Sequence, residues 1–211
     1  MHGLLRTVEY SIVAIIFAVI LGLVAAMFKL SHNKLLRAIS AIYVEIFRGT
    51  PLLVQVFFIV LGLPAIMPLN TWVGPSLYPI VAAATALALN EGAYITEIIR
   101  AGILGVDRGQ REAAESIGMS GFQTMRYIIL PQAFKRMIPP LVNQFAQTVK
   151  DTSLIAPVGV VELVYTGQII IAQNFAAFQI WSAIAILYFI VIFALTRFAG
   201  YLERRLQIDK R

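Results

Sequence analysis

Five apolar segments, each long enough to cross a lipid bilayer, follow one another along this chain of 211 residues. A membrane-spanning helix needs about 20 predominantly apolar residues. Only 13% of the residues are charged, against about 25% in a typical soluble domain. The long runs also lack the alternating pattern, about 10 residues per strand, of an outer-membrane barrel. The sequence therefore predicts an all-α, polytopic membrane protein in which residues 1–211 form one transmembrane domain. The predicted spans are about Tyr10–Phe28, Ile39–Leu63, Tyr78–Leu104, Met137–Val158 and Phe178–Phe198, with a loop at 105–136.

The placement of Lys and Arg predicts the orientation, because cytoplasmic loops of membrane proteins collect these residues. With the N-terminus outside and the C-terminus in the cytoplasm, 13 of the 17 basic residues fall on the cytoplasmic side. We attribute the net charge of +6 to these cytoplasmic basic residues and not to nucleic-acid binding. Basic residues follow the first apolar run, so it is expected to be a retained span rather than a cleaved signal peptide. The 13 residues are Lys29, Lys34, Arg37, Arg108, Arg111, Arg126, Lys135, Arg136, Arg197, Arg204, Arg205, Lys210 and Arg211.

Several kinds of chemistry have no candidate residues in this chain. There is no cysteine, and the two histidines, His2 and His32, lie near segment ends. Disulfides and thiolate metal sites are thereby excluded, and we expect no metal site. The GxxxxGK[ST] phosphate loop is absent, since no Gly-Lys dipeptide occurs. Any nucleotide chemistry must therefore belong to another chain.

The loop before the fourth span carries a spaced motif. Glu112, Ala113 and Ala114 are followed by Gly118 and, after nine further residues, by Ile128-x-Leu130-Pro131. Small Ala residues favour a helix that a partner can approach closely. Gly118 allows the positive φ that a sharp turn after this helix needs. Glu112 could cap the helix or pair with a basic residue of the partner. Pro131 would break the next helical segment. The pattern resembles the EAA motif of permease subunits in binding-protein-dependent ABC importers. An ordinary amphipathic interfacial helix is the alternative.

Three further segments are similar to polar amino-acid permeases. They are Phe47–Gln55 (FRGTPLLVQ), the pattern from Ala93 to Gly102 (AY-x2-E-x2-RAG), and Lys150–Leu154 (KDTSL). The resemblance covers nearly the whole chain. It implies the type I ABC importer transmembrane fold with five spans and a cytoplasmic coupling helix, in a cell inner membrane. It also implies a second permease copy or close paralogue, two ABC ATPase subunits that bind ATP and Mg, and an extracytoplasmic amino-acid-binding protein.

Ionisable groups inside spans are costly and usually functional. Asn90, Tyr94 and Glu97 form a stripe at i, i+4 and i+7 of the third span, and Gln144, Gln147, Thr148 and Asp151 form a similar stripe on the fourth. Such stripes must face each other or a water-filled path. Glu91 lies about 21 Å and Asp151 about 18 Å from the cytoplasmic boundary, by the rise of an α-helix. Transporter sites lie near that depth.

These stripes give the candidate substrate-binding residues. Arg100 is expected to neutralise Glu97 at i+3, which leaves Glu91 as the carboxylate for a cationic side chain. The hypothesis favours a basic amino acid, namely arginine, lysine or histidine, with glutamine or another polar amino acid as the alternative. The α-carboxylate would meet donors near Thr152, Ser153 or Arg100. The full set is Asn90, Glu91, Tyr94, Glu97, Arg100, Asp151, Thr152 and Ser153.

Other charged residues are expected to be structural. Glu45 and Arg48, at i and i+3, are interpreted as an ion pair, and Glu162 as an outer-surface residue. Two distant alternatives to an ATP-driven importer remain. One is an ion-coupled secondary transporter that uses Glu91 and Asp151. The other is an intramembrane hydrolase with Lys150 and Ser153 as a dyad, although Asp151 would keep that lysine protonated. The favoured interpretation is a pore subunit without enzymatic activity.

Overall fold

The computed structural model describes residues 2–206, and over this range the chain is helical with no strand. Lys210 and Arg211, two of the basic tail residues, lie outside the described residues. The long helices are α1 (His2–Lys29), α5 (Tyr78–Leu104), α8 (Leu130–Asp151) and α10 (Ala177–Arg205). The remaining elements are α2 (Lys34–Gly49), α3 (Leu52–Phe57), η1 (Phe58–Gly62), η2 (Leu63–Ala65), α4 (Leu69–Val73), α6 (Arg108–Ser116), α7 (Gly121–Gln123), η3 (Thr124–Ile129), η4 (Thr152–Val158) and α9 (Leu163–Asn174).

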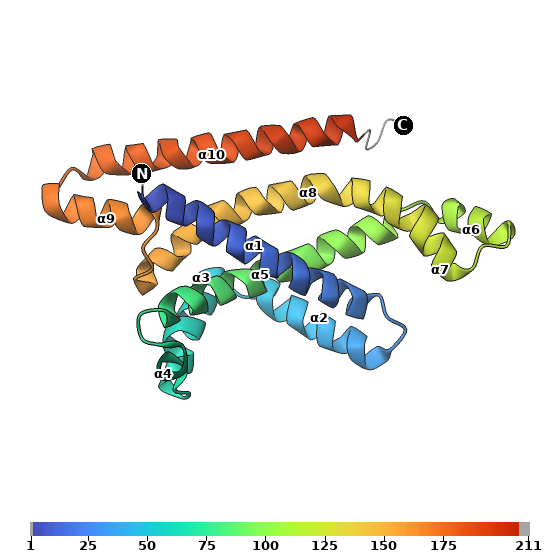
Figure 1. Cartoon of the computed structure of the whole chain (residues 1–211), viewed down its shortest axis with the longest axis horizontal. Coiled ribbons are helices and arrows are strands. Elements are labelled where there is room, and N and C mark those ends of the chain that lie inside the picture. The colour runs from blue at the N-terminus through green and yellow to red at the C-terminus, as the bar shows by residue number, and fades with distance from the viewer. Residues whose placement is uncertain (1, 207–211) are drawn as a thin grey trace.

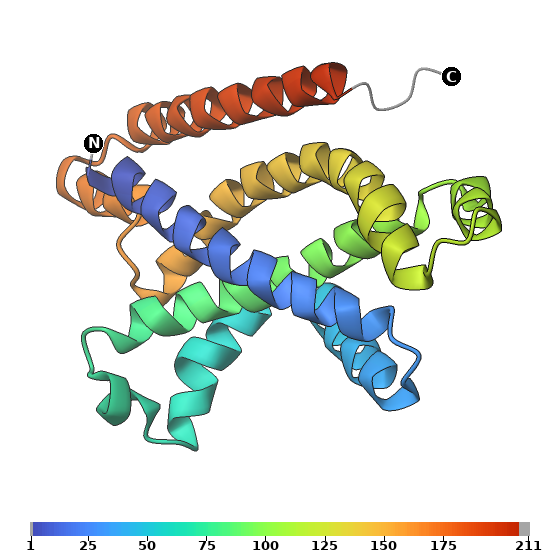
Figure 2. The same ribbon diagram turned by 45° about the vertical axis from the view of Figure 1, so that its right-hand side comes forward.

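The molecule has two distinct ends. Short helices α6 and α7 lie at one end, and α9 lies with the N-terminus at the other (Figure 1). Helix α10 runs alongside α8, and the segment that carries α4 projects from the body (Figure 1). The C-terminal end of α1 and the start of α2 lie toward the α6 end (Figure 2). The basic residues predicted to be cytoplasmic on these elements therefore share one end of the fold.

The central packing is the crossing of α1 over α5 (Figure 2). Every buried residue of α1 is Gly, Ala, Ser or Thr, and Ala14, Ala18, Gly22 and Ala26 recur at intervals of four. Small residues at this spacing let two helix backbones approach closely inside a membrane. A Cβ atom on Gly22 would lie 2.6 Å from Cγ2 of Ile95 on α5. The small residues of α1 thus allow its backbone to lie close to that of α5 at the crossing.

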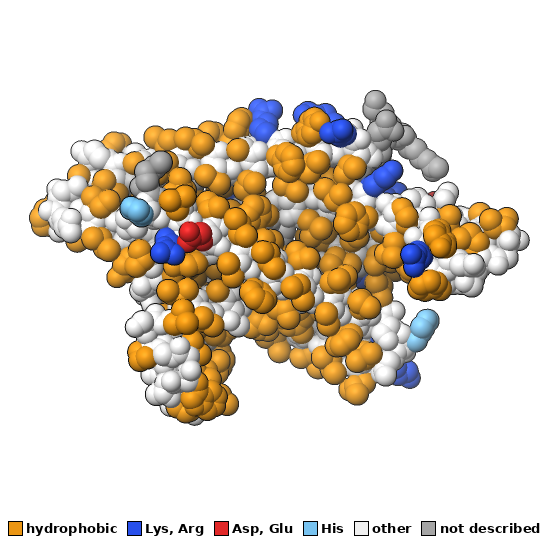
Figure 3. All heavy atoms as spheres, viewed as in Figure 1, with side chains coloured by type: hydrophobic (Ala, Val, Ile, Leu, Met, Phe, Trp, Pro, Cys, Tyr) orange, Lys and Arg blue, Asp and Glu red, His pale blue; other side chains and the backbone are white. Residues whose placement is uncertain are grey.

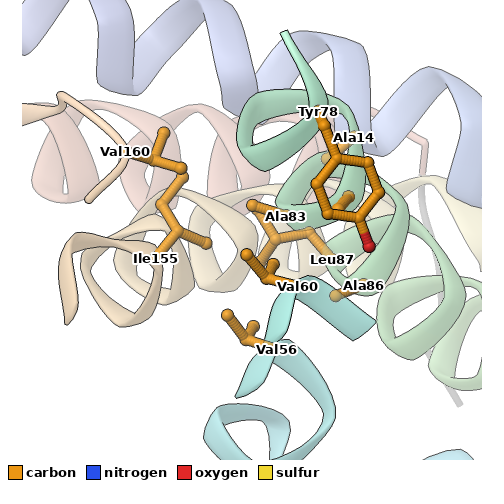
Figure 4. Close-up of a cluster of buried hydrophobic side chains, with 10 residues drawn as sticks. Ala14, Val56, Val60, Tyr78, Ala83, Ala86, Leu87, Ile155 and Val160 are labelled. Atoms are coloured by element: carbon orange, nitrogen blue, oxygen red, sulfur yellow. The ribbon is translucent and has the colours of Figure 1, made fainter. Parts of the chain in front are cut away.

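A cluster of buried aliphatic side chains surrounds the crossing on the α3 side. Val56 of α3, Leu87 of α5 and Ile155 of η4 are at most 1% exposed and belong to one cluster with Ala14 (Figure 4). Burial of such side chains contributes roughly 1.5–3 kcal/mol each in water. In a bilayer the gain comes from close packing instead. The cluster holds the short α3 against the long helices.

The predicted second span, Ile39–Leu63, which Pro51 interrupts in the sequence, is broken into separate helices in the structure. Helix α2 ends at Gly49, and the segment Leu52–Ala65 is bent from it by 106°. Pro51 lies at the N-cap of α3, where its missing N–H and fixed φ are tolerated. Thr50 and Pro51 both have extended backbone dihedrals. The break leaves helix-end carbonyls that must find partners within the protein.

The fourth predicted span also differs from the structure. Helix α8 begins at Leu130, earlier than the predicted Met137, and the seven residues after Asp151 form the 3₁₀-helix η4. Pro131 does not break the helical path. It lies in the first turn of α8, directly after the π-helix Thr124–Ile129, and the helical path continues through it.

Helices α1 and α10 are each long and apolar enough to cross a membrane, and the count rises to as many as four if each of the bent pairs 34–65 and 121–174 is one span. Helix α5 is 27 residues long but carries the polar stripe. Hydrophobic side chains are spread over the face in Figure 3, with charged side chains few. The chain is an all-helical polytopic membrane protein, as predicted.

Glu162 is not an outer-surface residue but is fully buried. Its Oε1 accepts a hydrogen bond of 2.7 Å from the Tyr165 amide, which caps α9. Its Oε2 accepts hydrogen bonds from the hydroxyls of Tyr188 on α10, at 3.1 Å, and Thr7 on α1, at 3.4 Å. Three helices meet at this carboxylate because the start of α9 offers orphan backbone donors.

The crossing of α1 and α5 gives a stability prediction. Gly22→Ala should destabilise the folded chain by about 1–3 kcal/mol, because the new methyl group collides with Ile95. Gly200→Ala in α10 is the matched control, since nothing lies within 4 Å of the position that its methyl group would take. Helix propensity should make that variant more stable by up to about 1 kcal/mol. Thermal unfolding in detergent compares the two, and equal melting temperatures would contradict the close crossing.

Candidate functional site

Two adjoining hollows lie between the α2–α3 break, α5 and α8. The central hollow has a volume of about 470 Å³, and the loop-side hollow, toward Gly105, has about 420 Å³. Arg48, Tyr94 and Gln144 line both, so the two form one groove. The central hollow is lined by Arg48, Gly49, Thr50, Pro51, Leu52, Asn90, Tyr94, Gln144, Gln147 and Asp151.

Arg48 is the groove's exposed cation. Its guanidinium lies 5.1 Å from the ring centroid of Tyr94, a cation–π arrangement. Glu45 does not pair with it among the described residues, so the expected Glu45–Arg48 ion pair is wrong. The break at Thr50 ends α2 just after Arg48, which places this side chain at the groove. The sequence could have indicated this position, because Arg48 directly precedes the Gly-Thr-Pro segment that interrupts the span, and transporter sites often lie at such interruptions.

The polar stripe of α8 faces α5, as the spacing predicts. Gln147 Nε2 donates a hydrogen bond of 3.0 Å to Oδ1 of Asp151, and Gln144 Nε2 donates one to Oε2 of Glu91. Gln144, Gln147 and Asp151 all line the central hollow. The stripe therefore supplies one carboxylate and two amides to the groove. The two glutamines were not among the predicted site residues.

Glu91 lies behind this wall and not in it. Its side chain is fully buried and lines neither hollow. Gln144 stands between Glu91 and the groove, because it lines both hollows and donates to the carboxylate. The expectation that Glu91 directly receives a cationic side chain has no support in this arrangement.

Asn90 forms hydrogen bonds to residues on both sides of the break between α2 and α3. Its Nδ2 donates to the Phe47 carbonyl, at 2.9 Å, and to Gln55 Oε1, at 3.0 Å. Gln55 Nε2 in turn donates to the carbonyls of Phe47 and Thr50, at 2.8 and 3.0 Å. These bonds satisfy the carbonyls that the end of α2 leaves open. Asn90 borders the central hollow, but its amide hydrogens are committed to these partners.

Glu97 is neutralised from two sides. Arg100 Nε donates to it at 2.9 Å, as the i+3 spacing predicts, and Lys29 at the end of α1 also pairs with it. Glu97 lines the loop-side hollow, whereas Arg100 lines neither hollow. The second cation was missed because Lys29 is 68 residues distant and reaches Glu97 only through the crossing.

Thr152 and Ser153 are turned to local backbone. Thr152 donates to the Val149 carbonyl and Ser153 to the Lys150 carbonyl, at 2.8 and 2.7 Å. Neither side chain lines the central or the loop-side hollow. Both residues belong to the 3₁₀-helix η4, which begins where α8 ends.

The loop of residues 105–136 carries α6 on the end remote from α9 (Figure 1). Gly118 has a φ of +85°, its amide bonds the Glu115 carbonyl and the Met119 amide bonds the Ala114 carbonyl. This is a Schellman ending, which favours glycine. Glu112 does not cap the helix, since Asp107 does so, and instead pairs with Arg108 at 2.9 Å. Ala114 is buried and Ala113 exposed.

Comparison with known proteins gives consistent similarities. Residues 18–208 match the sequence profile of the family described as binding-protein-dependent transport system inner membrane component. The chain is 40% identical to the glutamine transport system permease protein GlnP of Escherichia coli K12 over 207 residues, 98% of this chain and 92% of the relative. It is 42% identical to the L-cystine transport system permease protein TcyB of Bacillus subtilis 168, over 97% of this chain and 85% of the relative.

Solved structures show the same fold. A crystal structure of an amino acid ABC transporter with histidines has a TM-score of 0.88 at 36% identity, over 97% of this chain and 92% of that one. An inward-facing structure of the MetNI methionine ABC transporter has a TM-score of 0.76 at 19% identity, over 97% of this chain and 94% of that one. At that identity the second likeness concerns the fold alone.

The helix break yields a second stability prediction. Gln55→Leu should lower the free energy of unfolding by about 1–3 kcal/mol, because the Thr50 carbonyl loses its donor and the Asn90 amide loses one of its two acceptors. Val54→Leu, on the exposed neighbouring position, is the control and should be near neutral. Thermal unfolding of both variants in detergent is the measurement. A Gln55→Leu variant as stable as the control would show that the amide does not support the break.

Proposed function

Since this chain belongs to the family of binding-protein-dependent transport system inner membrane components, we propose that it carries a polar amino acid with an uncharged side chain, such as glutamine, through the α5–α8 groove. The chain is a permease subunit of an amino-acid ABC importer, a membrane pore component without catalytic activity of its own. The secondary-transporter and hydrolase alternatives therefore fall away.

The charges that line the central hollow carry the proposal. Among the described residues, Arg48 is exposed and has no acidic partner, and Asp151 is contacted by the Gln147 amide but by no cation. An α-amino acid presents one carboxylate and one ammonium group. Arg48 suits the carboxylate, because guanidinium binds carboxylates bidentately, and Asp151 suits the ammonium. Thr50, Tyr94, Gln144 and Gln147 then remain for the substrate side chain.

The carboxylates left over do not favour a basic side chain. Glu91 is buried behind Gln144, and Glu97 is already paired with Lys29 and Arg100. A lysine or arginine side chain in the groove would find no further free carboxylate among the residues that line it. The glutamine permease relatives agree with this inference. We therefore favour the uncharged alternative over the basic amino acid that the sequence suggested.

The family's ATPase partners dock, in this proposal, on the end that carries α6. Ile117 at the end of α6 and Phe122 within α7 are 79% and 72% exposed and offer apolar contacts. The complete assembly would hold two ABC ATPase subunits, a second permease copy or close paralogue, and an extracytoplasmic amino-acid-binding protein at the α9 end. The N-terminus would lie outside, in line with the basic residues at the α6 end. ATP would draw the two ATPases together and open the groove outward, and hydrolysis would reverse this state. ATP can drive the change because it binds the two states with different affinity.

ATP hydrolysis by the assembled complex tests the substrate. With saturating binding protein in nanodiscs, glutamine should stimulate hydrolysis more than arginine or lysine. Asp151→Asn and Arg48→Gln should each weaken the apparent affinity for glutamine at least about tenfold, because each removes a charge-assisted contact. Glu45→Gln, on exposed α2 surface, is the control and should behave as wild type. Stronger stimulation by arginine would restore the basic alternative.

The coupling loop gives a separate prediction. Gly118→Ala should reduce amino-acid-stimulated hydrolysis about fivefold, because a Cβ at φ +85° costs roughly 1–2 kcal/mol and distorts the end of α6. Gly121→Ala is the control, since its new methyl group would have nothing within 4 Å and its φ is not positive. Copurification of the ATPase reports assembly. Unchanged coupling in Gly118→Ala would argue against α6 as the contact.

A further inference from the structure

We propose that Glu91 is a positioning residue that sets amide selectivity, by holding the Gln144 side chain with its carbonyl oxygen toward the groove. This inference rests on the proposed function and deepens it. It gives the buried carboxyl group of α5 a role other than direct contact with substrate. It also explains why a costly ionisable group is placed behind the wall of the groove.

The contact between the two residues fixes the direction of the amide. Gln144 Nε2 donates to Oε2 of Glu91, and Glu91 is fully buried. Oε2 of Glu91 accepts this hydrogen bond, so the NH₂ end of the Gln144 amide is the end that faces Glu91. The Gln144 carbonyl oxygen is then the end that remains for the groove, which Gln144 lines in both hollows. A neutral partner such as glutamine could hold either end.

The neighbouring glutamine on α8 has the same arrangement. Gln147 Nε2 donates to Oδ1 of Asp151, which leaves its carbonyl oxygen free as well. Two amides one helical turn apart, both oriented by acidic residues, make this side of the groove rich in hydrogen-bond acceptors. Arg48 lies on the α2 side of the same hollow. The central hollow therefore has hydrogen-bond acceptors on its α8 side and a cation on its α2 side.

This division distinguishes two substrates of nearly the same shape. The side-chain amide of glutamine has an NH₂ group that can donate to the Gln144 oxygen. Glutamate has only acceptors at that position, so its carboxylate would face another acceptor. A site that leaves polar groups unpaired rejects the wrong ligand strongly. The arrangement thus favours glutamine over glutamate without a charged residue in contact with the side chain.

A buried carboxyl group would be a poor choice for a purely structural contact. Oε1 of Glu91 is buried and has no hydrogen-bond partner, and no cation pairs with the side chain among the described residues. Burial of such a group without full pairing is costly. The cost is accounted for if the carboxyl group is what keeps Gln144 in one orientation.

The test measures binding selectivity in the assembled complex. The permease with its ATPase partner is placed in nanodiscs without binding protein, and apparent Kd values for glutamine and glutamate come from ligand-induced shifts in melting temperature. Glu91→Gln frees Gln144 to turn its NH₂ group into the groove. The ratio of the two Kd values should fall about tenfold toward equality, which is the effect of one oriented hydrogen bond. Glu91→Asp keeps a carboxylate and should restore most of the preference.

Two further variants keep the test decisive. Glu45→Gln makes the same chemical change on exposed α2 surface and should leave the ratio unchanged. Gln144→Met removes the oriented amide itself and should lower the ratio as Glu91→Gln does, which covers the case in which that variant does not assemble. A merely structural role for Glu91 would weaken both ligands equally or lower the melting temperature alone.

The outcomes separate the inference from the function on which it rests. If the wild-type complex prefers glutamine and Glu91→Gln keeps that preference, the positioning role is overturned. If Gln144→Met keeps the preference, the role is overturned as well. If the wild-type complex itself shows no preference for glutamine, the proposed substrate fails instead.

Discussion

The close crossing of α1 and α5 is the contact on which the rest of the structure depends. Lipid provides little driving force between apolar helices, so association relies on dense packing of small side chains. Gly22 on α1 and Gly92 on α5 allow that approach, and a Cβ at Gly92 would lie 3.2 Å from the Cβ of Leu21 on α1. The crossing brings the Lys29 side chain to Glu97 and lets α2 reach the Leu89 carbonyl through Tyr43. A polar face of α5 is thereby organised by a helix that itself buries only small residues.

Broken helices create the second constraint, because each break exposes backbone groups that the bilayer cannot hydrogen bond. Gln55 and Asn90 satisfy the end of α2, and Glu162 caps the start of α9. These side chains look functional in a sequence but are used to complete the backbone. Arg48 and Asp151 are not used in this way, and they line the central hollow as two opposite charges. The proposed amino-acid site therefore consists of polar side chains that the fold does not need for its own hydrogen bonds.

Regular features of the sequence predicted much of this fold. Helix α5 has the bounds of the predicted third span, and the polar stripes of α5 and α8 lie next to one another because period 3.6 fixes their faces. The positive φ of Gly118 and the Glu97–Arg100 pair also follow from local rules. Glu45, Arg48 and Pro51 mark an interruption in the second span, but the 106° angle after Gly49 did not follow from them. Contacts between residues distant in sequence determine the other features. These are the burial of Glu91 and Glu162, the pairing of Glu97 with Lys29, and the position of Arg48 at the groove. Spacing along one helix cannot supply them.

The central claim is that an amino acid occupies the hollow between Arg48 and Asp151. The absence of native cysteine allows a direct test with single cysteines. Thr50→Cys places a thiol on the lining of that hollow, and Ser116→Cys places one on exposed α6. In the assembled complex, glutamine should slow the reaction of the Thr50→Cys thiol with a water-soluble methanethiosulfonate reagent and leave that of the Ser116→Cys thiol unchanged. Equal labelling rates of the Thr50→Cys variant with and without glutamine, in a complex whose ATP hydrolysis glutamine stimulates, would contradict the account.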